Sequence, residues 1–164
     1  MDTQTKARVT KDVANKKITV VKDLDAGIKK VWTAYTDRTM LDQWWAPKPW
    51  RAETREMNFT EGGRWLYSMN GPDNERQWAK MEFQKIDAPN QFTAIDSFTD
   101  EKGTKDTNMP SQHWSNSFKK NGDGTRLTVE ITFDKEEDMK KILDMGFEKG
   151  FQMGLENLDE LLAK

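Results

Sequence analysis

The stretch from Asp134 to Lys164 constrains the fold most, because no other segment of the chain is both long and apolar along one face. Its apolar residues recur at three- and four-residue spacing, which is typical of one helix face. They are Met139, Leu143, Phe147, Phe151, Leu155, Leu158 and Leu162. Asp134 and Glu137 have the spacing of a capping box. We therefore expect one helix of roughly 40 Å, with an apolar face that another element must cover.

Glycines recur at four-residue spacing inside this predicted helix, at Gly146, Gly150 and Gly154. Each glycine in a helix interior costs about 1 kcal/mol relative to alanine, so the spacing indicates a row where side chains are unfavourable. Either the helix backbone lies close against another element, or the row leaves a hollow beneath the helix. Charged residues such as Glu148 and Lys149 exclude a membrane glycine motif.

The chain before this helix is a succession of short strands separated by turns. Period-two alternation is clearest near its end, where Leu127, Val129 and Ile131 share one face. The predicted strands are 18–24, 51–58, 64–69, 77–86, 91–99, 112–119 and 125–133. Two short helices, 27–35 and 38–44, should follow the first strand, with Asp25 and Asp37 as their caps.

This order of elements contains no strand–helix–strand repeat, which favours an antiparallel sheet. The predicted fold class is α+β, with a curved sheet of about seven strands wrapped around the C-terminal helix. Residues 1–15 are polar and lack periodicity, and are predicted to form a mobile N-terminal arm. Residues 16–164 have the length of a single domain.

Composition excludes several functions. The chain has 26 Lys and Arg against 28 Asp and Glu, for a formal net charge of −2, so nothing favours nucleic-acid binding. It has no cysteine and a single histidine, His113, so we expect no metal and no other cofactor. We find no signal peptide and no apolar run of membrane-spanning length, and we expect a cytoplasmic protein without a membrane partner.

Candidates for catalysis are few. His113 is the one side chain suited to act as a base at neutral pH, and no nucleophile motif accompanies it. Alternation puts His113 on one face of its strand and Trp114 on the other, and either face could point inward. Glu82 should point outward, whereas Asp96 shares a face with Phe98. We predict no catalytic residue.

The remaining candidates are apolar. The chain has 7 tryptophans and 9 methionines, which either fill the core or form an adaptable lining for an apolar guest. Alternation puts Trp65, Tyr67 and Met69 on one face of their strand, and Met81 and Phe83 on one face of the next. With these faces inward, a ligand cavity beneath the last helix would be lined by Trp65, Tyr67, Met69, Met81, Phe83, His113, Phe147, Gly150 and Phe151.

Several short motifs in this order carry a resemblance to a known family. They are VWTAYTD at 31–37, LDQWWAP at 41–47, EGGRW at 61–65, MNGPD at 69–73 and GTRLT at 124–128. Over residues 18–162 the chain resembles the START-like, or SRPBCC, superfamily with its helix-grip fold. Within it, the chain is similar to the branch related to the C-terminal domain of the heat-shock chaperone ATPase activator. The resemblance implies an internal apolar cavity rather than a fixed chemistry.

Three functions follow as hypotheses. The first, which we prefer, is a binding module for a small apolar or aromatic molecule held between sheet and helix. The second is an interaction domain for a chaperone, which the resemblance alone suggests. The third is a cyclase or hydrolase acting on a cavity-bound substrate, since some members of the superfamily are enzymes.

Overall fold

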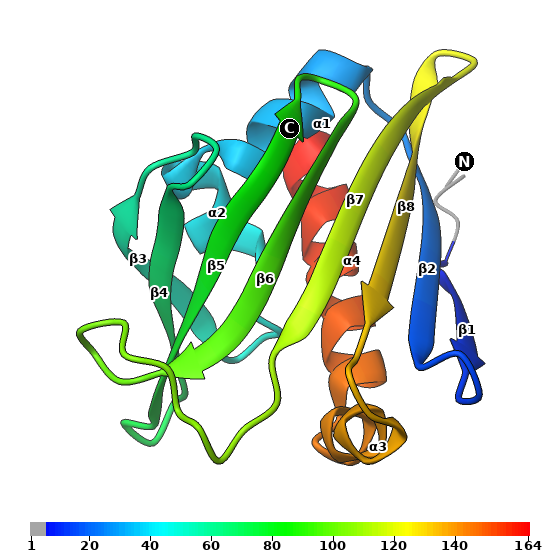
Figure 1. Cartoon of the computed structure of the whole chain (residues 1–164). Helices are drawn as coiled ribbons and strands as arrows, with labels where there is room; N and C mark the ends of the chain where they lie inside the picture. Colours follow the sequence, from blue (N-terminus) through cyan, green and yellow to red (C-terminus); the bar gives the residue numbers. More distant parts are fainter. Residues whose placement is uncertain (1–5) are drawn as a thin grey trace.

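The structure, a computed structural model, describes residues 6–164 and has an α+β architecture in which a curved sheet wraps around the C-terminal helix (Figure 1). The described strands are β1 (Arg8–Asp12), β2 (Lys17–Leu24), β3 (Arg51–Met57), β4 (Arg64–Asn70), β5 (Arg76–Asp87), β6 (Gln91–Thr99), β7 (Gln112–Asn121) and β8 (Gly124–Thr132). The described helices are α1 (Ile28–Thr36), α2 (Arg38–Trp44), α3 (Glu136–Asp144) and α4 (Phe147–Leu162). The predicted helix-grip fold is confirmed.

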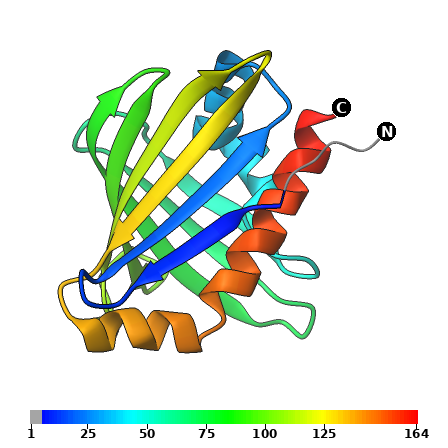
Figure 2. The same cartoon turned by 90° about the vertical axis from the view of Figure 1, so that its right-hand side faces the viewer.

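All strands join one antiparallel sheet in the order β1-β2-β8-β7-β6-β5-β4-β3. Consecutive strands are neighbours except at one place, where β2 pairs with β8 and Ile18 lies opposite Ile131. The chain leaves β2 through α1 and α2 and re-enters the sheet at the far edge, β3. This long crossing carries α1 and α2 over the concave side of the sheet, and α4, which follows β8 and α3 in the chain, lies on the same side (Figures 1 and 2).

The sheet has one strand more than predicted. Arg8–Asp12 pairs with β2, with Arg8 opposite Val21 and Asp12 opposite Lys17. The prediction that these residues belong to a mobile arm was therefore wrong, because edge pairing uses backbone groups and needs no apolar pattern. Residues 1–5 of that predicted arm lie outside the described residues.

The C-terminal helix is broken in two, which corrects the prediction of one continuous rod. Gly146 separates α3 from α4 with φ of 89°, a left-handed conformation that favours glycine. α3 lies across the open end of the sheet, and α4 runs along the concave face (Figure 2). The predicted capping box is also wrong. The N-cap position of α3 is Lys135, and no side chain among the described residues donates or accepts a capping hydrogen bond there.

The two short helices differ in their caps. The Asp37 carboxylate accepts hydrogen bonds from the Thr39 amide at 2.8 Å and the Met40 amide at 3.2 Å, which confirms it as the cap of α2. Asp25 was wrongly predicted to cap α1, which begins after Gly27 without a side-chain cap from the described residues. The paired helices then position Trp44, whose indole donates to the Ala34 carbonyl at 2.8 Å.

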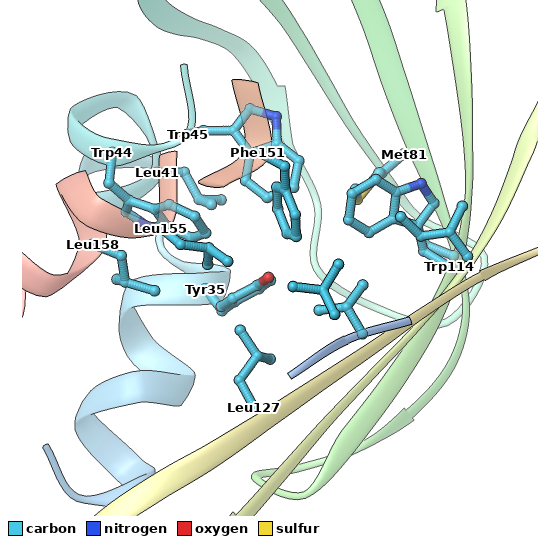
Figure 3. Close-up of a cluster of buried hydrophobic side chains, with 14 of the residues drawn as sticks. Tyr35, Leu41, Trp44, Trp45, Met81, Trp114, Leu127, Phe151, Leu155 and Leu158 are labelled. Carbon is cyan, nitrogen blue, oxygen red and sulfur yellow. The ribbon is translucent and has the colours of Figure 1, made fainter. Parts of the chain in front are cut away.

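The core lies between α4, α2 and the inner face of the sheet. Leu155 and Leu158 of α4 are almost fully buried, as are Leu41 of α2 and Leu127 of β8 (Figure 3). Burying a leucine side chain stabilises the fold by about 1.5–3 kcal/mol. This cluster therefore fixes the C-terminal half of α4, whereas the N-terminal end of the helix borders a cavity.

Candidate ligand cavity

A partly open cavity of about 220 Å³ lies between the sheet and the first turns of α4. From the sheet it is lined by Tyr67, Met69, Gln77, Ala79, Asp96, Ser97, Phe98, Gln112 and Trp114. From the helices and the segment after α2 it is lined by Trp45, Pro47, Ile142, Met145, Gly146, Phe147, Gly150 and Phe151. Strands β4 to β7 therefore supply one wall, and α3 and α4 supply the other.

Aromatic rings form the inner surface of this cavity. The Trp114 ring centroid lies 5.4 Å from that of Phe151 and 5.8 Å from that of Trp45. Phe147 and Phe151 stack on each other along α4 with centroids 5.5 Å apart. Trp45 and Phe151 reach in from the helical side and Trp114 from the sheet (Figure 3). Interlocked rings of this kind hold each other in fixed positions.

The glycines of α4 have separate structural roles. A Cβ atom on Gly154 would lie 3.2 Å from the Trp45 carbonyl oxygen, so that glycine permits close packing on the segment after α2. Asn157 fastens the same segment by donating to the Ala46 carbonyl at 2.9 Å. Gly146 and Gly150 instead line the cavity. Close packing and a hollow beneath the helix each explain part of the glycine spacing.

Three residues that line this apolar space carry buried polar atoms without protein partners. Asp96 Oδ1, Gln112 Oε1 and Trp114 Nε1 are buried, and none has a hydrogen-bond partner among residues 6–164. Asp96 is 9% exposed and Gln112 is 5% exposed. The two residues are direct partners across β6 and β7, so their side chains lie side by side on the inner face.

Burial changes the ionisation of the cavity wall. It raises the pKa of the Asp96 carboxyl from 3.8 to about 7, although a hydrogen bond from the Ser97 backbone opposes the shift. It also raises the pKa of Tyr67, with the nearby Asp96 charge adding to the effect and a hydrogen bond with Trp45 opposing it. The carboxyl at the cavity wall can therefore change its charge near neutral pH.

Five of the nine predicted cavity residues do line the cavity: Tyr67, Met69, Phe147, Gly150 and Phe151. Three others are buried in the core instead, namely Trp65, Met81 and Phe83. The prediction placed them in the cavity because period-two alternation reports the face of a strand but not the position along it.

The positions of these core residues have specific causes. The Trp65 indole donates to Thr54 Oγ1 at 3.0 Å, which turns its ring toward β3. Phe83 packs against Phe59 with ring centroids 4.7 Å apart, near the other end of the sheet. Met81 is 2% exposed and lies opposite Asp96 in the β5–β6 pairing.

His113 was wrongly predicted to line the cavity. In β7 the buried residues are Gln112, Trp114, Asn116 and Phe118, so His113 points to the outer face. There its Nε2 lies 3.4 Å from Asp134 Oδ1, and both side chains are largely exposed. The large aromatic rings at 114 and 118 take the inner face because they gain more from burial than the histidine and its serine neighbours.

The polar wall of the cavity and part of its aromatic wall were not predicted from the sequence. Asp96 had a usable signal, since it is in phase with Phe98, and both residues do line the cavity. Gln112 lies on the same face of its strand as Trp114, but the sequence did not show which face points inward. The pairing of β7 with β8 settles this. Trp45 and Pro47 lie outside any strand or helix, where periodicity gives no information.

Residues 6–164 contain neither a candidate metal-binding cluster nor a candidate membrane-spanning helix. No cluster of three or more histidine, aspartate or glutamate residues in this part of the chain could hold a metal ion. Within the same residues, no helix has the length and apolar character needed to span a membrane.

A curved antiparallel sheet around a C-terminal helix, with a cavity between them, defines a helix-grip protein of the SRPBCC type. Residues 25–163 match the family described as Activator of Hsp90 ATPase homolog 1-like protein, and the chain belongs to this family. No curated protein matches the chain at a significant level.

Solved structures of similar proteins share the whole fold. A protein from Arthrobacter aurescens is 33% identical, with a TM-score of 0.91, over 97% of this chain and 92% of that one. A protein from Staphylococcus epidermidis is 32% identical, with a TM-score of 0.83, over 94% and 93% of the two chains. Protein Ms6760 from Mycobacterium smegmatis is 28% identical, with a TM-score of 0.89, over 96% and 97%.

Proposed function

We propose that this domain binds a small, mainly apolar or aromatic molecule in the cavity between β4–β7 and α4. The observation that carries the proposal is the combination of an aromatic wall with buried polar atoms that lack protein partners. An interior built only for stability would fill such space and pair such atoms, because an unpaired buried polar group costs roughly 1–3 kcal/mol.

The size of the cavity sets the size of the ligand. Its volume of about 220 Å³ exceeds that of a water molecule many times over. An apolar protein cavity of roughly 150 Å³ can hold benzene. One or two fused aromatic rings with a short substituent therefore match the available space, and their burial would replace the ring contacts that the cavity walls lack.

A cavity-filling substitution tests this function. Ala79 lies on the inner face of β5 and lines the cavity, so Ala79→Phe should occupy the space a ligand needs. Binding of naphthalene derivatives, measured by calorimetry and by the rise in unfolding temperature, should be lost in this variant. The matched control is Thr128→Phe. Thr128 lies on the outer face of β8, so this substitution should leave binding unchanged.

The result that would contradict the proposal is equally direct. If the wild-type protein shows neither heat of binding nor thermal stabilisation with a broad panel of aromatic and lipid-like compounds, the cavity is not a binding site. Equal binding by wild type and a folded Ala79→Phe variant would place the site elsewhere on the molecule.

Membership of the family named for the chaperone ATPase activator supports a second candidate, an interaction with a chaperone. Its test is the ATPase rate of an Hsp90-type chaperone with and without the domain. A rate change that persists in Ala79→Phe would favour a surface interaction independent of the cavity, whereas an unchanged rate would remove this candidate.

A further inference from the structure

We propose that Asp96 and Gln112 form an amine-recognition site inside the cavity, so that the ligand is an apolar or aromatic molecule carrying a protonated amine. This inference rests on the proposed function and narrows the class of ligand. It comes from the two acceptor atoms that the described residues leave unpaired at one place on the inner wall.

The geometry favours a donor that can reach two acceptors at once. Asp96 Oδ1 and Gln112 Oε1 belong to residues directly opposite each other on adjacent strands, and both line the cavity. Side chains in such a pair lie about 5 Å apart at their Cβ atoms, close enough for one small group to bridge them. An ammonium group carries three hydrogen-bond donors and no acceptor, so it can satisfy both oxygens together.

The charges around the site favour a cation over an anion. Among the described residues that line the cavity, no lysine, arginine or histidine is present, and Asp96 and Tyr67 are the ionisable groups. Lys22, a buried cation on the inner face of β2, does not line the cavity and forms an ion pair with Asp159 at 2.7 Å. The elements packed against Asp96 therefore contribute no cation to the cavity lining that could balance its carboxylate.

The aromatic wall of the cavity also favours a cationic ligand. Trp45, Trp114 and Phe151 line the cavity together with Asp96, and the negative faces of such rings attract an organic cation by roughly 0.5–2 kcal/mol. The unpaired Trp114 Nε1 is a donor, and an oxygen acceptor near the ligand's amine would complete its hydrogen bonding. A carboxylate ligand would instead meet the Asp96 charge in a site of low polarity.

Ionisation of Asp96 should make amine binding dependent on pH. Because the pKa of this carboxyl is raised to about 7, the site is mostly neutral at pH 5.5 and mostly negative at pH 8.5. An alkylamine, with a pKa near that of lysine at about 10.4, stays protonated across this range. Amine binding should therefore strengthen as the pH rises from 5.5 to 8.5, whereas binding of a neutral compound of the same shape should not.

Three probes of one shape test the inference: 1-naphthylmethylamine, 1-naphthylmethanol and 1-naphthoate, each titrated into the protein by calorimetry at pH 6 and pH 8. At pH 8 the amine should bind at least about tenfold more tightly than the alcohol, as expected for a hydrogen bond to a charged group. In Asp96→Asn this preference should disappear while the alcohol still binds. The control Glu82→Gln, which removes a half-exposed carboxylate on the outer face of the sheet, should keep the preference.

Two outcomes distinguish a failure of the amine site from a failure of the cavity as a binding site. If amine and alcohol bind equally well at pH 8, or if the preference survives in Asp96→Asn, the amine site is refuted while the cavity remains a binding site. If none of the probes binds and the broader compound panel also fails, the proposed function itself is refuted. Should Asp96→Asn not fold, the pH dependence of the wild-type preference still decides, because it requires no substitution.

Discussion

Lys22 of β2 and Asp159 of α4 form an ion pair inside the protein, with Lys22 Nζ 2.7 Å from Asp159 Oδ2. The side chains are only 3% and 6% exposed. Lys22 occupies an inward position of its strand, in phase with Ile18, Val20 and Leu24, so an apolar face carries a charge that α4 must neutralise. This pair joins the sheet to the C-terminal helix at one defined register.

Removing either member of this pair should destabilise the fold strongly. Asp159→Asn leaves the buried Lys22 ammonium without its counter-ion, and the expected loss is about 3–5 kcal/mol in the free energy of unfolding. Urea denaturation followed by circular dichroism measures it. The double variant Lys22→Met with Asp159→Leu should recover most of the loss, since it replaces the pair by apolar side chains of similar size.

The exposed pair of Lys48 and Glu160 is the matched control. Its atoms are 3.0 Å apart, but both side chains are more than 60% exposed. Glu160→Gln on the neighbouring position of α4 should therefore change the unfolding free energy by less than about 1 kcal/mol. Similar losses for Asp159→Asn and Glu160→Gln would show that burial does not set the strength of the inner pair.

Gly150 and Gly154 should respond in opposite directions to alanine. The nearest atom to a Cβ on Gly150 is Pro47 Cγ at 3.8 Å, an ordinary contact, so Gly150→Ala should stabilise α4 by up to about 1 kcal/mol. A Cβ on Gly154 would press on the Trp45 carbonyl at 3.2 Å. Because the Asn157 amide fastens this segment, overpacking of about 1–3 kcal/mol should exceed the helix gain.

Thermal unfolding of both variants checks the difference. The expected order of unfolding temperatures is Gly150→Ala above wild type and Gly154→Ala below it. If both variants are more stable than wild type, the segment after α2 can move away, and close packing is not the reason for glycine at position 154.

The pH dependence of stability should reveal Asp96. Its pKa is 3.8 in an ordinary setting and about 7 in the fold, so between these values the folded protein holds a proton that the unfolded chain has released. The stability from this group is complete below pH 3.8 and declines as the pH rises to about 7. The total decline is on the order of a few kcal/mol, at about 1.4 kcal/mol for each pH unit.

Asp96→Asn should abolish this decline and make the protein more stable than wild type above pH 7. The measurement is the free energy of unfolding at pH values from 4 to 9, expressed as the difference between variant and wild type. Glu82→Gln serves as the control, since its outward carboxylate should produce no such change. A flat difference curve for Asp96→Asn would mean that the carboxyl has an ordinary pKa in the fold.

Substitution of His113 should not change ligand binding. Its side chain lies on the outer face of β7 near Asp134, separated from the cavity by the sheet. We expect His113→Ala to bind aromatic probes as the wild type does, whereas Trp114→Ala at the adjacent inward position should lose binding. Calorimetric titration of both variants measures this, and a large effect of His113→Ala would contradict the assigned face of β7.

Local patterns in the sequence predicted most elements, because they depend on neighbours along the chain. The alternation at 125–133 and the run at 91–99 recovered β8 and β6, and Asp37 was found as a cap from its place before a helical pattern. Residues such as Tyr67, Phe147 and Phe151 were placed at the cavity by the same periodicities.

The sequence by itself determined most of the strands and helices and, outside β7, which of their faces are apolar, since both follow from the periodicity of burial. The tertiary structure alone decided that β1 joins the sheet, that Gly146 divides the last helix, and that Trp114 rather than His113 points inward. It also left Asp96 Oδ1 and Gln112 Oε1 without hydrogen-bond partners among the described residues, and both residues line the cavity. Those outcomes depend on contacts between residues far apart in the chain, where the energy of packing and hydrogen bonding has no counterpart in local spacing.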